Sequence, residues 1–383
     1  MKTTIEIPIG PQHPALHEPL MLRVRVDGEC VEDVQVITGY NHRGIEKLGE
    51  SRSFLQAMYV FGRVCGICNI VHQLTYVQVL EKIGGIEVLP RAKYLRSLVS
   101  ELERIHSHLL VLAVEAEIMG FKGLFMLIMR DREPIMKLKE IVTGQRVIAD
   151  YMWPGGVKRD INDEKVNIIR KTLRNLRERM KKYREVFSED STVLSRLADV
   201  GIIKKNEAIQ YGLVGPTARG SGVETDIRVD EPYAAFDEVP VNIVVREEGD
   251  SLARMLVRVD EIFESINIIE YILDNLPSGP IAPKVLKRRY PKGEAISRSE
   301  APRGELIYHM ISRGGDKPYR VKVRTPSFPN ILNGSRIAFR DAVLADVPVI
   351  FGSFDPCISC MERILVVNEK GEEKIVSIRE LRK

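Results

Sequence analysis

The sequence lacks long apolar runs, a large net charge and more than a few cysteines. No apolar stretch approaches the roughly 18 residues of a membrane-spanning helix, so the pattern argues against a transmembrane segment. The formal net charge is only +4, from 57 basic and 53 acidic residues, which gives no reason to expect nucleic acid as a partner. Residues 1–7 alternate like a strand and form no signal peptide. We therefore expect a cytosolic chain.

The composition is otherwise that of a folded globular protein. Hydrophobic residues make up 44% and charged residues 29% of the 383, enough for one large core or two domains. Many lysines, arginines and acids beside few glutamines are typical of thermophile proteins, in which surface ion pairs are abundant. The sequence shows no internal repeat and no low-complexity tract.

Four of the five cysteines form two Cys-x-x-Cys pairs, one near each end of the chain. Cys65 and Cys68 make the first pair, Cys357 and Cys360 make the second, and Cys30 is left over. In the cytosol such pairs are more often metal-binding or redox-active than disulfide-bonded. A tight turn can aim both sulfurs of a pair at one point, and two pairs offer four thiolates to a soft metal. We therefore predict that the fold brings the pairs together around a metal centre.

The two cysteine pairs are also compatible with three alternative roles. They could be small buried side chains, ligands of a structural zinc ion, or partners in a long-range disulfide. The segment around Cys65 is an apolar helical stretch rather than a small zinc ribbon, which favours the metal-centre interpretation over structural zinc.

Hydrophobic periodicity predicts an α+β fold that is mainly α. Residues 3–9, 20–27 and 29–38 alternate apolar and polar side chains and should form a small antiparallel sheet. Helical patterns occupy 51–83, 90–120, 134–150, 163–187, 191–199 and 250–275, and the third of these is expected to begin near Pro134. Short alternating runs at 305–312, 318–325, 347–351 and 364–368 predict strands, and Gly371-Glu372-Glu373 predicts the turn of a last hairpin.

These elements predict a long-helix bundle core with small antiparallel sheets formed by the N- and C-terminal regions. We expect a single domain with an N-terminal sheet over 1–50, a helical core over 51–278 and a C-terminal sheet region over 279–383. Because both terminal sheets pack on one core, the two cysteine pairs can lie near each other.

Three side chains outside the cysteine pairs are candidates for the site. Glu18 follows His13 and His17 in a loop stiffened by prolines, where a carboxylate could relay protons or simply face solvent. His72 lies one helical turn after Cys68 and could hydrogen-bond a coordinated sulfur or fill the core. Arg303, between a proline and a glycine, could hold an anionic ligand over a metal or form an ordinary ion pair.

Two helices carry charged patterns of their own. On the helix at 90–120, His108 falls four residues after Arg104 and shares its face, which suggests a buried polar network or helix packing. The helix at 163–187 is very basic and is either a solvated face or a docking surface for an acidic partner.

Taken together, the motifs resemble the large subunit of nickel–iron hydrogenases, most closely the membrane-bound, energy-converting branch called group 4. The related quinone-site subunit of complex I and the membrane-bound sulfane sulfur reductases are similar too. The resemblance covers essentially the whole chain, through residues 10–14, 42–46, 63–72, 101–109, 155–157, 215–222, 300–305 and 355–363. Complex I homologues have lost the thiols, so retention of all four favours the hydrogenase branch.

The resemblance implies roles for individual residues. It implies that Cys65, Cys68, Cys357 and Cys360 hold nickel, and that Cys68 and Cys360 also bridge to an iron that carries CO and cyanide. By the same resemblance Glu18 is a proton gate, and Arg303 lies above the open metal position. Asp355 would orient that guanidinium, and Glu46 would bind an additional metal or carry protons.

The resemblance also implies a reaction and partners. Protons would be reduced to H2 with electrons from ferredoxin, passed through 4Fe-4S clusters in a small iron–sulfur subunit and another iron–sulfur subunit. Membrane-embedded antiporter-like subunits would hold the chain at the cytoplasmic face of the cell membrane and translocate ions. One alternative is a subunit without a working nickel–iron site in a ferredoxin-dependent sulfane sulfur (polysulfide) reductase. Another is a structural scaffold subunit that binds zinc.

Overall fold

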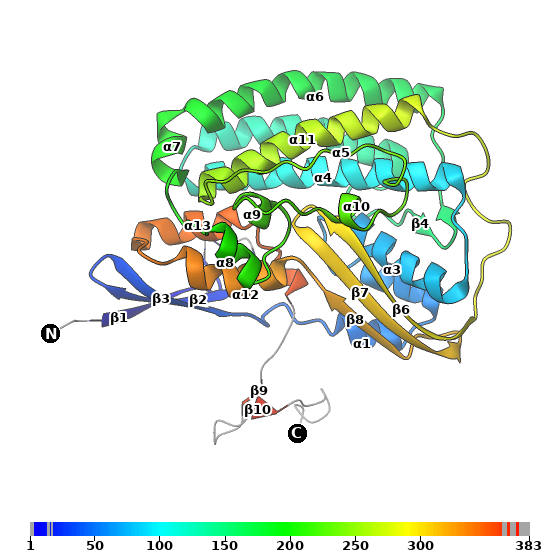
Figure 1. Ribbon diagram of the computed structural model, residues 1–383, viewed down its shortest axis with the longest axis horizontal. Helices are drawn as coiled ribbons and strands as arrows, with labels where there is room; N and C mark the ends of the chain where they lie inside the picture. Colours follow the sequence, from blue (N-terminus) through cyan, green and yellow to red (C-terminus); the bar gives the residue numbers. More distant parts are fainter. Residues whose placement is uncertain (1–3, 14–15, 17, 362–365, 368–372, 375–383) are drawn as a thin grey trace.

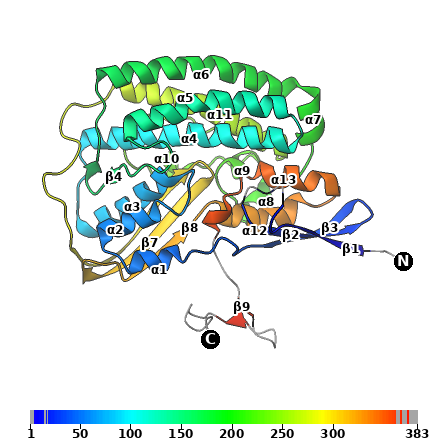
Figure 2. The same cartoon turned by 180° about the vertical axis from the view of Figure 1, so that it is seen from behind.

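The computed structural model describes residues 4–13, 16, 18–361, 366–367 and 373–374. A layer of long helices covers one side of the molecule, and a three-stranded sheet with short helices forms the other side (Figures 1 and 2). A second three-stranded sheet extends from the body at the N-terminal end (Figure 1). The fold is α+β and mainly α, which confirms the predicted class. Among the described residues, no helix is both long enough and apolar enough to cross a membrane.

The N-terminal sheet consists of β1 (Thr4–Ile9), β2 (Met21–Asp27) and β3 (Cys30–Ile37), which pair antiparallel in sequence order. Leu22, Val24 and Val26 alternate with exposed arginines along β2, so a single face of the sheet is buried. That face joins a small apolar core that also contains residues of α12 (Ser327–Ala338). The three predicted strands are thus present.

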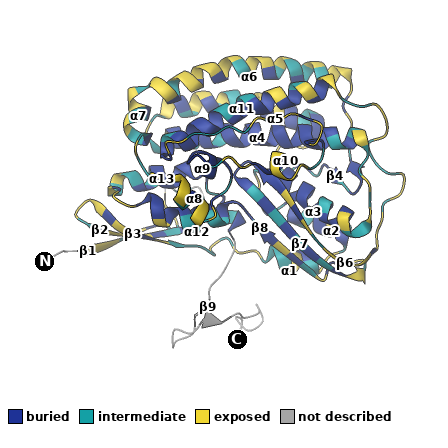
Figure 3. Ribbon diagram, viewed as in Figure 1, coloured by how far each residue is buried: buried dark blue, intermediate teal, exposed yellow. Residues whose placement is uncertain are grey.

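The helical layer is built around α4 (Pro90–Ile118), which is buried on most of its surface (Figure 3). Pro90 supplies the first turn, where no backbone N–H is needed. Helices α3 (Asn69–Gly84), α5 (Lys122–Thr143) and α11 (Ser251–Asp274) pack against α4. The long helix α6 (Asp163–Glu189) lies over α5 and α11 and is followed by the short α7 (Ser191–Leu197).

The basic helix α6 is amphipathic. Its buried side chains recur at helical spacing, namely Ile169, Leu173, Leu176, Met180, Tyr183 and Phe187. Part of its basic face pairs with α11, because Arg177 lies 2.8 Å from Glu270 and Arg184 lies 3.1 Å from Asp260. The predicted basic face is therefore partly paired within the chain and partly exposed (Figure 3).

The C-terminal region contains a long hairpin of β6 (Tyr290–Ala301) and β7 (Gly304–Gly315), with β8 (Arg320–Arg324) paired to β7. The sheet packs on α3 and on the short helix α1 (Ile45–Glu50), next to α2 (Phe54–Phe61). Ala301 pairs with Gly304, so Pro302 and Arg303 form the two-residue turn of the hairpin. The tip of a rigid hairpin therefore positions Arg303.

Two sequence-based predictions are wrong. The segment 347–351 belongs to the helix α13 (Val347–Ser353), with a proline in its first turn, and is not a strand. A short apolar run does not distinguish a buried helix from a strand. The helix expected near Pro134 begins instead at Lys122, and Pro134 lies inside α5. Pro134 and Arg130 are both exposed there, so water can satisfy the carbonyl that loses its helical bond.

Several short elements complete the chain. They are β4 (Met152–Trp153), β5 (Gly156–Val157), α8 (Lys205–Gln210), α9 (Gly215–Arg219), α10 (Ile227–Asp230) and the 3-10 turns η1 (Leu344–Asp346) and η2 (Ile358–Cys360). Two further strands, β9 (Val366–Val367) and β10 (Glu373–Lys374), pair antiparallel. Of the turn predicted at 371–373, only Glu373 lies among the described residues.

Candidate metal centre

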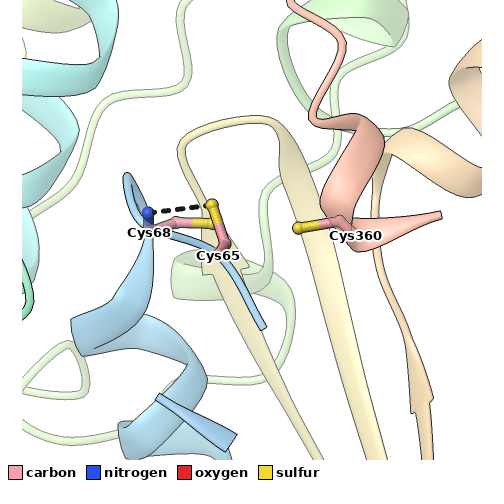
Figure 4. A group of neighbouring side chains, drawn as sticks. All are labelled: Cys65, Cys68 and Cys360. Atoms are coloured by element: carbon pink, nitrogen blue, oxygen red, sulfur yellow. Dashed lines mark hydrogen bonds between the residues drawn. The ribbon is translucent and has the colours of Figure 1, made fainter. Parts of the chain in front are cut away.

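The four paired cysteines lie together in the interior, as free thiols. The sulfur of Cys357 is 3.3 Å from that of Cys65 and 2.8 Å from that of Cys360. The sulfurs of Cys65, Cys68 and Cys360 all lie within 4.8 Å of one another, and Figure 4 shows these three side chains converging from two elements. All four residues are at most 9% exposed. The fold thus brings the two distant pairs to one point.

Local backbone structure fixes the position of the first pair. The first pair occupies the loop between α2 and α3, and the backbone N–H groups of Ile67 and Cys68 both donate to the sulfur of Cys65, at 3.3 Å. Hydrogen bonds from the other three thiols, that of Cys357 first, bring the pKa of Cys65 well below its usual value, against the opposing effect of burial. Cys65 is therefore the thiol most readily converted to a thiolate ligand.

Arg43 ties the two cysteine loops to each other. Its guanidinium donates to the carbonyls of Arg63 (2.8 Å) and Val64 (2.9 Å) before the first pair, and to the carbonyl of Ser359 (3.3 Å) within the second. Glu18 holds the second loop from another side by accepting the backbone N–H (2.9 Å) and the hydroxyl of Ser359. Sequence reasoning missed the role of Arg43, although its motif was among those that resemble the family.

Arg303 and Asp355 form a buried pair at the hairpin tip. Nη2 of Arg303 donates to Asp355 Oδ1 at 2.6 Å, Nε donates to the Asp355 carbonyl at 2.8 Å, and Nη1 donates to the hydroxyl of Ser107 at 3.4 Å. Burial lowers the pKa of Arg303, but Asp355 and then the cysteines outweigh it and raise the pKa well above its usual value. The guanidinium is therefore a fixed positive charge beside the thiols.

His72 connects the thiols with the aromatic core. Its Nε2 lies 3.8 Å from the sulfur of Cys360, and its Nδ1 shares a 2.8 Å hydrogen bond with the hydroxyl of Tyr308. Burial lowers the pKa of His72 to about 4, so the imidazole is neutral near pH 7. Tyr308, on β7, was missed by sequence reasoning because a tyrosine in an alternating strand carries no signal of its own.

Glu46 lies where α1 meets β8. Its carboxylate accepts the backbone N–H of Val323 at 3.0 Å and the ammonium of Lys322 at 3.1 Å. Its charge acts on Tyr308, whose pKa is raised well above its usual value by burial first, and then by Cys360, Cys68 and Glu46. The charge of Glu46 thus acts on the tyrosine that is hydrogen-bonded to His72.

Helix α4 fixes the loop of the first pair from behind. Glu103 accepts the backbone N–H groups of Ile70 (2.8 Å) and Val71 (2.9 Å) at the start of α3 and lies 3.6 Å from the ammonium of the buried Lys139. Burial raises the pKa of Glu103 to about 7 although Lys139 opposes the shift. His106 donates to the carbonyl of Ile67 at 3.0 Å, so two side chains of α4 hold the Cys-x-x-Cys turn.

The polar face predicted on α4 is part of a buried network. His108 donates to Glu261 of α11 at 2.8 Å, and Arg104 donates to the carbonyl of Glu300 at 2.7 Å, directly before the hairpin turn. Arg219 pairs with both Glu261 and Glu300. This network joins the hairpin that carries Arg303 to the helical layer.

A cavity of about 300 Å³ opens beside the thiols. Glu18, Cys65, Cys357, Arg303 and Asp355 form its polar end. The remaining walls are mostly apolar, with Leu16, Ile67, Leu110, Val111, Val114, Ile118, Phe351 and Ile358. A small reactant could therefore reach the thiols, a fixed cation and a carboxylate in one enclosed place.

Buried soft donors beside a fixed cation and an apolar cavity are chemically suited to bind a soft metal. Comparison with protein families agrees. Residues 119–363 match the respiratory-chain NADH dehydrogenase 49 kDa subunit, and residues 43–113 match the nickel-dependent hydrogenases. The chain belongs to this family of hydrogenase large subunits and complex I 49 kDa subunits, as the sequence resemblance predicted, and it is a subunit of an oxidoreductase.

Individual relatives align over nearly the whole chain. The membrane-bound hydrogenase subunit alpha of Pyrococcus furiosus is 39% identical over 99% of this chain and 92% of its own length. The carbon monoxide-induced hydrogenase of Rhodospirillum rubrum is 38% identical over 93% of this chain and all of its own. A chain of the archaeal membrane-bound sulfane sulfur reductase superposes with a TM-score of 0.90 at 35% identity, covering 94% of this chain and 99% of that one.

Proposed function

We propose that this chain is the catalytic large subunit of a membrane-bound, ferredoxin-dependent complex that reduces protons to H2 at a nickel–iron centre and couples this to ion translocation. The observation that carries the proposal is the convergence of Cys65, Cys68, Cys357 and Cys360 beside Arg303. Relatives whose names identify them as hydrogenases support the proposed reaction.

The donor set fits the proposed group. Two sulfurs bound to one metal at about 2.3 Å lie at most about 4.6 Å apart. The sulfur of Cys357 lies within this limit of Cys65 (3.3 Å) and Cys360 (2.8 Å), and the sulfurs of Cys65, Cys68 and Cys360 lie within 4.8 Å of one another. We propose that Cys65, Cys68, Cys357 and Cys360 would hold nickel, and that Cys68 and Cys360 would also hold an iron that carries CO and cyanide. When bound, this group supplies low-valent redox chemistry that soft thiolate donors stabilise.

The side chains around the thiols move protons and shape the open side of the centre. Glu18 lines the cavity with Cys357 and is held by Ser359, so it can exchange a proton with a neighbouring thiol. Arg303 presents its charge to the same cavity, and Asp355 fixes its orientation. His72 places Nε2 toward Cys360, and a donated N–H there stabilises sulfur charge.

Glu46 is proposed to carry protons rather than to bind a metal. Its side chain is 20% exposed, and its charge acts on Tyr308, which is hydrogen-bonded to His72. The proposed route runs from Glu46 at α1 towards Cys360 by way of Tyr308 and His72, which share a hydrogen bond.

The electrons are proposed to come from ferredoxin through partner subunits. A 4Fe-4S cluster needs four cysteines, and only Cys30 remains outside the two pairs. We therefore place the clusters in a small iron–sulfur subunit and a second iron–sulfur subunit, and we place the chain on the cytoplasmic face of the membrane beside antiporter-like subunits. The name of the sulfane sulfur reductase as a membrane complex supports this assembly. We also propose that residues 1–383 act as one domain.

Reduction of sulfane sulfur is a second candidate reaction. The structural similarity to the sulfane sulfur reductase supports it, and the apolar cavity beside the thiols would accept a small polysulfide. A scaffold role with zinc is the third candidate.

Metal analysis of the complex matured in its native host separates these functions. A hydrogenase contains nickel near one per chain, shows infrared bands of metal-bound CO and cyanide, and evolves H2 with reduced ferredoxin. A sulfane sulfur reductase lacks these bands and H2 evolution and reduces polysulfide. A zinc scaffold contains zinc and fails both assays. Absence of nickel and of the infrared bands rejects the hydrogenase proposal.

A further inference from the structure

Behind the cavity, where α4, α11 and α13 meet, several buried polar atoms have no protein partner. Both carboxylate oxygens of Glu115, Nε and Nη2 of Arg258, and Oδ2 of Asp355 form no hydrogen bond to any residue that the structure describes. Glu115 and Arg258 have no exposed surface, and Asp355 is 4% exposed. An unpaired buried polar group costs about 1–3 kcal/mol, so packing alone does not explain five such atoms in one region.

Glu115 lies directly behind the wall of the cavity. Its neighbours Val114 and Ile118 line the cavity from α4, and Gly352 lines it from α13. A Cβ added to Gly352 would lie 2.3 Å from Glu115 Oε2 and 2.8 Å from Ile118 Cδ1. The carboxyl group therefore packs against the bare Cα of Gly352, and the absence of a side chain there permits this approach.

Charged side chains lie around Glu115, from Asp355 at the cavity to the partly exposed Arg196. Arg258 and Arg254 face it from α11, Arg196 faces it from α7, and Asp355 faces it from the segment after α13. Burial raises the pKa of Glu115 to about 8, although the three arginines oppose the shift. The carboxyl group thus holds its proton at neutral pH and can release it to a stronger acceptor.

A surface exit lies next to this cluster. Arg196 is 34% exposed and pairs with Asp346 at 3.6 Å. Asp346 lines a separate hollow on the surface. Glu115 is distinct from Glu18, the other candidate proton carrier, which holds the second cysteine loop through Ser359.

We propose that Glu115 is a proton-carrying site on a buried route between the metal-site cavity and the surface at the Arg196–Asp346 pair. Buried polar groups without protein partners are ordinarily bridged by ordered water, and such waters would join Glu115, Arg258 and the free oxygen of Asp355. One proton enters the route for each proton delivered to the cavity. Glu115 alternates between carboxyl and carboxylate, and no electron moves along the route.

This proposal rests on the proposed function only for the direction in which protons move. Reduction of protons and reduction of sulfane sulfur both consume protons, so either reaction draws protons toward the cavity. The test of the proposal therefore includes a measurement that needs no turnover. In the purified complex, the infrared carbonyl band of a buried carboxylic acid is followed between about pH 6 and about pH 10. Burial raises the pKa of Glu103 and of Glu300 to about 7, so their bands also titrate in this interval in every variant. The wild-type complex is expected to lose a further band with a midpoint about pH 8, E115Q is expected to lack this one band, and E117Q is expected to keep it. Glu117 is an exposed carboxylate on the same helix and provides the matched control.

The second measurement is turnover with either acceptor. E115Q is expected to reduce the rate by about tenfold or more, with an unchanged KM for ferredoxin and unchanged metal content, whereas E117Q stays at the wild-type rate. G352A, which displaces the carboxyl group, is expected to slow turnover as well. A wild-type complex without the titrating band, or an E115Q complex as fast as E117Q, overturns the proposal. Loss of nickel from the wild-type complex would overturn the hydrogenase function and leave the band test intact.

Discussion

Among individual residues, Arg43 has a positioning role, because it holds the two cysteine loops together. It donates to three carbonyls that belong to both cysteine loops, and hydrogen bonds from a charged donor contribute about 1.5–3 kcal/mol each when well buried. Arg43 is exposed, so the effect is smaller. We expect R43A to lower the free energy of unfolding by about 2 kcal/mol and to lower the metal content of the purified complex.

Arg52 provides the control for this variant. It is exposed and lies outside both cysteine loops, so R52A is expected to keep the wild-type stability and metal content. Denaturant unfolding and metal analysis measure both variants. Equal metal content in R43A and R52A would show that Arg43 does not position the loops.

Glu18 supports a prediction about proton transfer. Gln can accept the backbone N–H of Ser359 through its amide oxygen and donate an amide N–H to the hydroxyl of Ser359, but it cannot release a proton at neutral pH. We expect E18Q to lose H2 evolution while it keeps its metal and its thermal midpoint. An E18Q complex with wild-type activity would reject the proton-gate role.

The raised pKa of Glu115 has a consequence for stability. The folded chain binds this proton more tightly than the unfolded chain, whose carboxyl titrates near pH 4.3. Stability from this group is therefore full at low pH and is lost as the pH rises from that value to about 8. We expect the thermal midpoint of the complex to fall less over this interval in E115Q than in the wild type. Parallel curves would contradict the raised pKa.

At the scale of elements, the sequence predicted those with a strong period and missed those defined by context. The N-terminal strands and helices α4, α6, α7 and α11 carry clear apolar patterns and lie where they were expected. The strand β6 was not predicted, because its outer half is largely exposed and charged and is held by pairing with β7. Helix α13 was mistaken for a strand because its apolar run is too short to show a period.

The site shows the same division. The cysteines, Arg303 and Asp355 belong to motifs and were proposed from sequence, and the structure places them together. Glu103 and Ser107 lie in the 101–109 motif, but their roles were not predicted, and Tyr308 carries no sequence signal, because their contacts depend on how β7 and α4 pack around the loops. Such contacts arise only from tertiary packing.

The proline inside α5 gives a prediction for that element. Pro134 removes one helical hydrogen bond at an exposed position. P134A would restore the bond, while the unfolded chain would gain some freedom. We expect a net stabilisation of about 1 kcal/mol, measured as a higher thermal midpoint with unchanged activity. K137A, an exposed substitution one turn later, serves as the control and should change little. A lower midpoint in P134A would show that the proline fits a bend that α5 requires.

For the whole molecule, a metal at the four thiols would join regions that are distant in sequence. Cys65 and Cys357 are 292 residues apart and their sulfurs are 3.3 Å apart. A ligand present at 1,000 times its Kd stabilises the folded state by about 4 kcal/mol. We therefore expect complex matured without nickel to melt at a lower temperature and to be cleaved faster by protease. C30A, which leaves all four thiols in place, should keep the wild-type midpoint in both preparations.

The placement of the thiols also orders events in the cell. Cys65 and Cys68 leave the ribosome long before Cys357 and Cys360, so a growing chain holds only half of the donor set. The proposed metal could therefore be held by all four thiols only after the second pair has been synthesised. A chain that ends before the second motif would offer only the thiols of Cys65 and Cys68 to that metal.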